Sequence, residues 1–237
     1  MLRIGTWNVE HASPAKNPHR LERLRAADAD IWVLTETQDA LDLGSSYHAV
    51  HSEPRPKKPS PARWVSIWSK HPIIQRVPVR EPIRTVAALC HTPLGNLLVY
   101  GTVMPWSEDR GPAGTASWGA ERLRVVPEQA AEWKAMWDRF PDAAICVAGD
   151  FNIHIGGGLC GTRKGQRLLH DGLSAAGLAC VTGTDRIREG KLPKPHVDHI
   201  CLPEAWAQRS RVVEAWPGTV DGVRLSDHSA VVVQVQG

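Results

Sequence analysis

Acidic and amide side chains follow short apolar runs at five places along the chain. The segments are WNVE at 7–10, TET at 35–37, GDFN at 149–152, VDH at 197–199 and SDH at 226–228. A strand that ends in such residues keeps its apolar part in the core and presents the polar groups at a sheet edge. Each segment by itself is more often a surface carboxylate or a turn. Together they favour one site, because Mg²⁺ needs oxygen ligands of the kind that Asn8, Glu36 and Asp227 offer.

The elements that would position these side chains are mostly strands. Helices are predicted at 18–27 with Asn17 as cap, at 121–137 where Pro127 divides the pattern, and at 162–176 ending before Gly177. A Pro-Gly turn at 92–96 predicts a hairpin. The predicted strands outnumber the predicted helices, and the two do not alternate strictly along the chain. This pattern indicates an α/β fold with two packed sheets and outer helices. The nine runs that predict strands are 2–6, 30–34, 64–68, 85–89, 97–103, 144–148, 197–202, 211–215 and 229–235.

The composition is that of an ordinary globular chain. Of the 237 residues, 42% are hydrophobic and 22% charged, which excludes a disordered chain and suits one domain spanning 1–237. The net charge of +3 permits a polyanionic partner without requiring one. Five cysteines without a CxxC pair indicate reduced, structural thiols. No apolar run reaches the roughly 18 residues of a membrane span, so we expect a cytoplasmic protein without a membrane partner.

The five polar segments resemble, in wording and order, the endonuclease/exonuclease/phosphatase superfamily. This superfamily includes pancreatic-type deoxyribonucleases, abasic-site endonucleases and inositol-polyphosphate phosphatases. The similarity spans nearly the whole chain, and the combination of GDFN with a terminal SDH is fairly specific. It implies a four-layer sandwich, in which two packed mixed β-sheets are flanked by helices, and a metal-dependent phosphoesterase activity.

The resemblance assigns metal binding to one group of these side chains. It implies that Glu36 is the principal ligand and that Asn8 and Asp227 assist it, with Mg²⁺ as the expected ion and Mn²⁺ as an alternative. Glu10 stands where relatives often carry Asp or Gly, and is a supporting candidate. A cation at this place would act as a Lewis acid and lower the pKa of a bound water, as phosphodiester hydrolysis requires.

Catalysis is assigned by the same resemblance to a second group. Asp150 would orient and deprotonate the attacking water, Asn152 would hold a phosphate oxygen through its amide, and His228 would pair with Asp198. Attack on a phosphodiester puts negative charge on its oxygens, which fixed donors stabilise. A histidine held by a carboxylate keeps one tautomer or stays protonated, and so can donate to such an oxygen. The alternative is that His228 merely caps the final strand.

The segment GTVMPW at 101–106 departs from the superfamily pattern. Relatives commonly carry a His or Tyr at the end of this central strand, whereas Val103 and Met104 cannot donate a hydrogen bond to phosphate or leaving group. The departure leaves open how the leaving group is assisted. Arg84, His199 or an arginine from a loop are the candidates that could substitute.

Basic residues gather in three polar segments, and such clusters attract phosphate backbones. One loop carries Arg55 and its basic neighbours, a second group follows GDFN, and a third precedes Asp198. The alternative for each cluster is a solvated surface of mixed charge. Tryptophans that flank the loop at 107–119 could stack on bases, although core packing is the commoner role. The candidate nucleic-acid contacts are Lys57, Lys58, Arg63, Trp106, Trp118, Arg163, Lys164, Arg188 and Lys194.

Three classes of function stay open at this point. A nuclease is favoured by the basic loops, with nucleic acid as its substrate. A phosphatase or phosphodiesterase acting on a small phosphorylated molecule or a lipid headgroup is favoured by the modest net charge. A non-catalytic binding protein of the same fold is suggested only by Val103. The sequence does not indicate protein partners or an oligomeric state.

Overall fold

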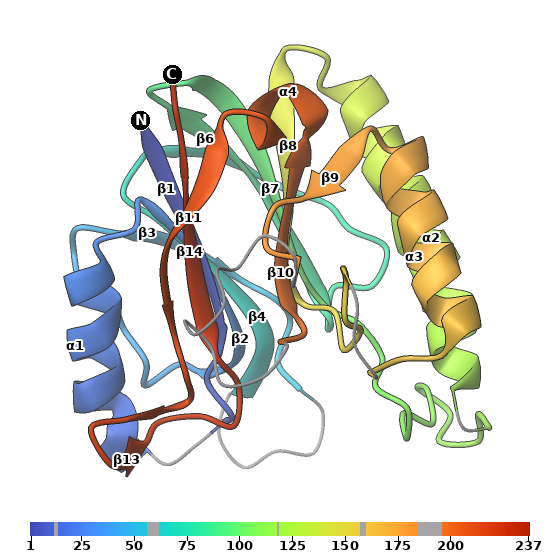
Figure 1. Cartoon of the computed structure of the whole chain (residues 1–237), viewed down its shortest axis with the longest axis horizontal. Coiled ribbons are helices and arrows are strands. Elements are labelled where there is room, and N and C mark those ends of the chain that lie inside the picture. The colour runs from blue at the N-terminus through green and yellow to red at the C-terminus, as the bar shows by residue number, and fades with distance from the viewer. Residues whose placement is uncertain (12–13, 56–61, 118, 157–159, 184–195) are drawn as a thin grey trace.

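Two mixed six-stranded sheets pack face to face in the computed structural model, which describes residues 1–11, 14–55, 62–117, 119–156, 160–183 and 196–237 (Figure 1). The first sheet contains β1 (Leu2–Asn8), β2 (Ile31–Gln38), β3 (His48–His51), β4 (Ala62–Ser69), β11 (Ser210–Trp216) and β14 (Ala230–Val235). The second contains β5 (Ile73–Val77), β6 (Thr85–Thr92), β7 (Gly95–Val103), β8 (Ala143–Asp150), β9 (Leu178–Cys180) and β10 (Asp198–Pro203). A separate ribbon pairs β12 (Thr219–Val220) with β13 (Val223–Arg224).

Strand order brings the two parallel pairs to the middle of the sheets. The orders are β11-β14-β1-β2-β4-β3 and β5-β6-β7-β8-β10-β9. Among the described strands, β1 with β2 and β7 with β8 are parallel, and the other neighbours are antiparallel. The carboxyl ends of β1, β2, β7 and β8 therefore meet the amino ends of β10 and β14 at one edge, where the polar segments lie.

Helices cover the outer faces of both sheets (Figure 1). On the first sheet lies α1 (Asn17–Ala27), whose Leu24 packs with Trp32 of β2. On the second lie α2 (Ala120–Arg139) and α3 (Arg163–Ala175), with the short η1 (Pro14–Lys16) and α4 (Glu204–Ala207) elsewhere. The resulting four layers confirm the predicted α/β sandwich. None of the described helices is long and apolar enough to cross a bilayer.

Apolar side chains from both sheets fill the space between them. Ile4 and Val33 of the first sheet and Val99 of the second are fully buried there. Each such side chain contributes about 1.5–3 kcal/mol when it leaves water. Gly101 on β7 allows close approach, because a Cβ at this position would lie 2.6 Å from Cγ1 of Val65. The same strands end in the polar segments, so this core fixes the base of the site.

All nine predicted strands are present, and the predicted hairpin joins β6 to β7. The hairpin needs a glycine, since Gly95 has a φ of +102°. The strands that were not predicted, β3, β5, β9, β12 and β13, are short and mostly half-exposed. These segments lack an apolar run. Their strand conformation therefore depends more on pairing with a neighbouring strand than on their own residues.

Two details of the predicted helices are wrong. Asn17 does not cap α1, because the helix begins at this residue and its amide donates to the carbonyl of Ala40. Pro127 does not divide α2, which runs unbroken through it. A proline inside a helix costs about 3 kcal/mol. Val126 and Trp133, on either side of it, are buried against the second sheet and keep the helix intact.

Candidate active site

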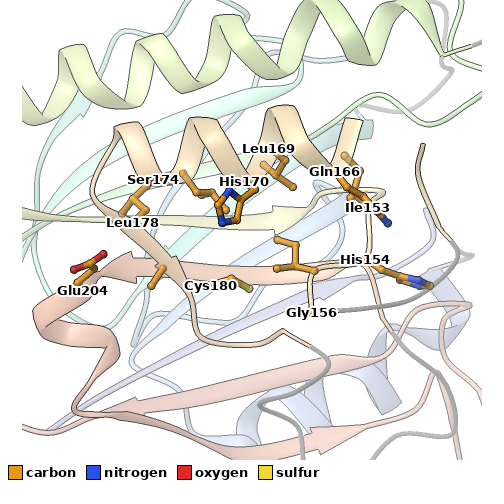
Figure 2. A pocket seen from close by; sticks show the side chains of 13 residues that line it. Ile153, His154, Gly156, Gln166, Leu169, His170, Ser174, Leu178, Cys180 and Glu204 are labelled. Atoms are coloured by element: carbon orange, nitrogen blue, oxygen red, sulfur yellow. The ribbon is translucent and has the colours of Figure 1, made fainter. Parts of the chain in front are cut away.

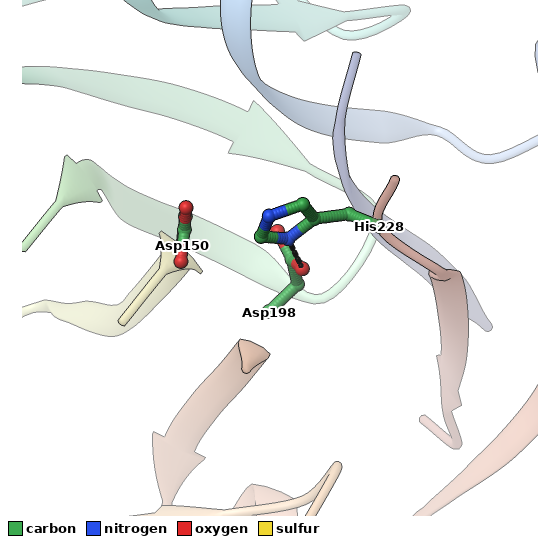
Figure 3. A group of neighbouring side chains, drawn as sticks. All are labelled: Asp150, Asp198 and His228. Atoms are coloured by element: carbon green, nitrogen blue, oxygen red, sulfur yellow. Dashed lines mark hydrogen bonds and ion pairs between the residues drawn. The ribbon is translucent and has the colours of Figure 1, made fainter. Parts of the chain in front are cut away.

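Among the described residues, Asp150, Asp198 and His228 form a close group of two carboxylates and an imidazole (Figure 3). Asp150 ends β8 and Asp198 begins β10, and the two residues face each other in the antiparallel register. Nδ1 of His228 lies 2.6 Å from Oδ2 of Asp198. One ligand atom from each residue lies within 4.8 Å of the others. The sequence segments GDFN, VDH and SDH therefore meet in space.

Charge and burial shift the acidities within this group. Burial opposes a charge on His228, but the carboxylates of Asp198 and Asp150 outweigh it and raise the pKa of His228 to about 10. Burial raises the pKa of Asp150 to about 7, and the charge of Asp198 adds to this effect. The group thus combines a protonated imidazole with a carboxyl group that titrates near neutral pH, as acid–base chemistry requires.

Asn8 connects the two sheets by donating to two carboxylates. Its Nδ2 lies 3.1 Å from Oε1 of Glu36 and 3.1 Å from Oδ2 of Asp150, while its Oδ1 accepts from the backbone N–H of Glu10. Glu36 has a φ of +53°, a left-handed conformation that is uncommon for Glu and costs about 1–3 kcal/mol. Nε2 of His11 lies 3.5 Å from its second oxygen. The backbone strain and these contacts fix the carboxylate of Glu36 beside Asp150.

Asn152 is held in place through both its side chain and its backbone. It has a φ of +51°, and its N–H donates to Oδ1 of Asp150 at 2.9 Å. Its Nδ2 donates to the carbonyl of Met104. The guanidinium of Arg122, buried on α2, donates to the carbonyls of Asn152 and Pro105, each at 3.0 Å. Arg122 therefore ties the loop after β8 to the loop after β7.

The terminal SDH segment is anchored to the first strand. Oγ of Ser226 donates to the carbonyl of Asn8 at 2.6 Å and accepts from the N–H of His228 at 3.0 Å. Nε1 of Trp7 donates to the carbonyl of His228 at 3.2 Å. These bonds place the imidazole of His228 toward Asp198 and leave Asp227 exposed at the rim.

The donor set fits a hard divalent cation. Burial raises the pKa of Glu36, an effect that hydrogen bonding by Asn8 partly offsets. Neither Glu36 nor Asp150 forms an ion pair with Lys or Arg in the described part of the chain. Oδ1 of Asp198 is buried without a hydrogen-bond partner there. Clustered carboxylates that are not neutralised by a direct ion pair with Lys or Arg suit Mg²⁺ or Mn²⁺, which take oxygen ligands.

Comparison with known protein families agrees with this geometry. Residues 5–228 match the endonuclease/exonuclease/phosphatase family. The chain belongs to this family. The match includes the segments around Asn8, Glu36, Asp150, Asp198 and His228. A search of curated proteins finds no matching relative.

Solved structures share the fold at low sequence identity. An AP endonuclease from Archaeoglobus fulgidus has a TM-score of 0.71 and 16% identity, with each chain covered completely. An AP endonuclease from Leishmania major has a TM-score of 0.69 and 16% identity, covering 100% of this chain and 88% of that one. The endonuclease domain of TRAS1, a telomere-specific non-LTR retrotransposon, has a TM-score of 0.67 and 16% identity, covering 100% and 99%. The family member described here thus has the deoxyribonuclease-I-like sandwich.

The supporting residues predicted from sequence all have partners of their own. The guanidinium of Arg84 is buried and ion-paired with Asp109. His199 is fully buried, and its ring bonds a backbone carbonyl at 2.9 Å and a threonine hydroxyl at 3.5 Å. Glu10 is ion-paired with Arg224 at the rim. Arg84 and His199 are therefore poorly placed to act as free donors in this member of the family.

The predicted nucleic-acid contacts occupy different environments. Arg163 and Lys164 are exposed at the start of α3. Arg63 lies within β4, where it forms a two-bonded ion pair with Asp39. Trp106 is half-buried, with its ring 5.6 Å from that of Trp64. The predicted contacts that lie outside the described residues are Lys57, Lys58, Trp118, Arg188 and Lys194.

Two hollows border the loop that follows β8. One of about 250 Å³ is lined by Asp198, Asp227 and His228, together with His154 and His196. A wider one of about 500 Å³ lies between α3 and β9 (Figure 2). It contains none of the predicted site residues and has a mixed apolar and polar lining. Of the two, only the smaller hollow borders the Asp198–His228 pair.

Three residues of the site were not predicted from the sequence as functional. Ser226 had a signal, since it belongs to the SDH segment, and its hydroxyl orders that segment. Nothing in the sequence signals the role of Arg122, because a single arginine in an amphipathic helix is usually a solvated side chain. His11 follows WNVE and reaches Glu36 only through the left-handed turn at residues 10 and 11.

Proposed function

We propose that this chain is a divalent-metal-dependent nuclease that hydrolyses phosphodiester bonds in DNA or RNA, with Mg²⁺ or Mn²⁺. The observation that carries the proposal is the position of Asp150. This carboxyl group accepts hydrogen bonds from Asn8 and from the backbone of Asn152, and it lies opposite Asp198 in the sheet. A buried carboxylate fixed beside an imidazole–carboxylate pair is suited to activating water next to a developing anion.

In the proposed reaction, Asp150 removes a proton from the attacking water as the new P–O bond forms. The bond to the leaving oxygen breaks, and that oxygen keeps the electron pair and takes up a proton from solvent water. A pKa of about 7 matches a general base at neutral pH. The protonated imidazole of His228 and the amide of Asn152 donate to the non-bridging oxygens, on which negative charge develops. Asp198 keeps the imidazole charged and correctly oriented.

Glu36 would hold the cation, with Asn8 and Asp227 as further ligands. When bound, the cation supplies Lewis-acid stabilisation of the charge on the phosphate. The protein contributes the fixed position of Glu36, which follows from its left-handed backbone and its hydrogen bond from Asn8.

Nucleic acid is the preferred substrate because exposed basic side chains, including Arg163 and Lys164, lie on the helix that follows the GDFN loop. The structural neighbours named as AP endonucleases and as a retrotransposon endonuclease agree with this choice. The second candidate is hydrolysis of a small phosphorylated molecule, which the net charge of +3 and the 250 Å³ hollow favour.

The test is hydrolysis of a substrate panel by the wild type and the His228→Ala variant. The panel contains plasmid DNA, single-stranded DNA, RNA, an abasic duplex and a phosphomonoester, each with Mg²⁺, with Mn²⁺ or with EDTA. His170→Ala is the matched control, because His170 is exposed on α3. We expect metal-dependent cleavage of a nucleic acid that His228→Ala loses and His170→Ala keeps. Turnover of the phosphomonoester alone would favour the second candidate, and inactivity on every substrate would favour a binding role.

A further inference from the structure

Near Asp150, the strand β7 provides no side-chain donor. Val103 lies opposite Asp150 in the parallel pair of β7 with β8 and is buried. Its own N–H donates to the carbonyl of Arg84, and the N–H of Met104 donates to the carbonyl of Asp150. The departing oxygen in the proposed reaction carries negative charge. Because neither Val103 nor Met104 offers a free donor, any further hydrogen bond to a phosphate oxygen must come from an element other than β7.

Arg55 places a guanidinium near Glu36. Its centre lies 3.7 Å from the ring centroid of Trp64, which is stacking distance. The ring of Trp64 lies 5.6 Å from that of His11, whose Nε2 is 3.5 Å from Glu36. Trp64 and Val103 pack in the same core cluster. Glu36 also interacts electrostatically with Arg55, so the guanidinium belongs to the surroundings of the metal ligand.

A buried donor of Arg55 has no hydrogen-bond partner in the part of the chain that the structure describes. Its Nη1 is buried without a hydrogen bond, and no described carboxylate forms an ion pair with it. Other partly buried arginines differ: Arg84 is paired with Asp109, Arg63 with Asp39, and Arg122 donates to two carbonyls. A buried charged donor without a partner is costly. Stacking on Trp64 fixes Arg55 despite this cost, and such preorganisation is typical of a site for an anion.

We infer that Arg55, stacked on Trp64, binds a phosphate oxygen of the substrate beside Glu36 and supplies the donor that Val103 and Met104 cannot. The inference rests on the proposed function and adds a residue to it. Arginine suits the task because its planar fork can donate two hydrogen bonds to one phosphate. The competing role is purely electrostatic, in which Arg55 only balances the charge of Glu36 and does not contact the substrate.

The test combines binding and turnover for Arg55→Ala, Arg55→Lys and the control Arg211→Ala, which removes an exposed arginine on β11. Binding of a deoxydinucleotide in EDTA is followed by tryptophan fluorescence, and cleavage of a fluorogenic oligonucleotide with Mg²⁺ gives kcat and KM. We expect Arg55→Ala to lose about ten- to a hundredfold in both dinucleotide affinity and kcat/KM. Arg55→Lys should recover only part of the loss, because an ammonium lacks the fork. Arg211→Ala should match the wild type.

Each result separates the two roles of Arg55. Dinucleotide affinity and kcat/KM unchanged in Arg55→Ala would overturn the inference, while metal-dependent cleavage by the wild type would leave the proposed function standing. A change in Mn²⁺ affinity without a change in dinucleotide affinity would also overturn it in favour of charge balance. A wild type that cleaves nothing would reject the proposed function, and the binding measurement in EDTA would still decide whether Arg55 contacts phosphate. Thermal unfolding of each variant verifies that the fold is retained.

Discussion

Nδ1 of His228 lies 2.6 Å from Oδ2 of Asp198, and this contact joins the two sheets at the edge where the polar segments meet. Asp198 begins β10 in the second sheet, whereas His228 lies just before β14 in the first. Asp198 is fully buried, so its charge interacts strongly with the imidazole of His228. Interactions across the interface between the sheets thus set the protonation state of the site.

The first prediction concerns the acidity of His228 in the metal-free protein. We expect the imidazole to stay protonated until about pH 10, because the carboxylates of Asp198 and Asp150 outweigh the effect of burial. The Asp198→Asn variant should lower this pKa toward the ordinary value of about 6.5. An NMR titration of the histidine rings in EDTA measures both. A His228 that titrates near 6.5 in the wild type would contradict the prediction.

The same shift has a consequence for stability. Because the folded pKa lies above the unfolded value, the stabilisation from charged His228 is complete below about pH 6.5 and is lost as the pH rises toward about 10. Urea unfolding of the wild type and His228→Asn should therefore give free energies that differ most at about pH 6 and converge at about pH 10. His170→Asn, a change at an exposed position, should show no such convergence.

The second prediction separates the base from the metal ligands. Asp150→Asn should reduce kcat by about 10²- to 10⁴-fold, since an amide cannot accept the proton from water. Mn²⁺ affinity, measured by calorimetry, should stay nearly unchanged, because the principal ligand Glu36 is intact. Asp171→Asn, at an exposed position on α3, is the control. Full activity in Asp150→Asn would reject the proposed mechanism.

The third prediction concerns Glu36. Glu36→Gln should weaken Mn²⁺ binding by about tenfold or more, because the variant replaces a charged oxygen ligand by a neutral amide. It should retain the fold, as the hydrogen bond from Asn8 can still reach the amide oxygen. Calorimetry with Glu22→Gln as the exposed control measures the effect. Unchanged Mn²⁺ affinity would place the ion elsewhere, and the Asp150–Asp198–His228 group would be the next candidate.

Local sequence signals predicted the fold and the meeting of the polar segments at one sheet edge, because both depend on short-range patterns, whereas the roles of the site residues stay a prediction. An apolar run followed by Asp, Asn or Glu indicates a strand end, and parallel pairing then brings such ends together, as for Asn8 and Glu36 at the ends of β1 and β2. The roles of Arg122 and Arg55 depend on tertiary contacts instead, with carbonyls on two loops and with Trp64. Pro127 was misjudged for a similar reason, since core packing outweighs its local cost.

The last prediction concerns Gly149, which precedes Asp150 in the GDFN segment. It has a φ of +134°, and a Cβ at this position would lie 2.1 Å from the carbonyl oxygen of Thr102 on the neighbouring strand. Gly149→Ala must therefore shift β8 away from β7, which we expect to cost about 3 kcal/mol or more of unfolding free energy.

Gly177→Ala provides the matched control for this experiment. Gly177 also has a positive φ, +63°, but the nearest atom to an added Cβ is 3.5 Å away. Its substitution should cost only the backbone strain of about 1–2 kcal/mol. Urea unfolding followed by circular dichroism measures both variants. If Gly149→Ala is no less stable than Gly177→Ala, the close approach of β7 and β8 does not explain the glycine before Asp150.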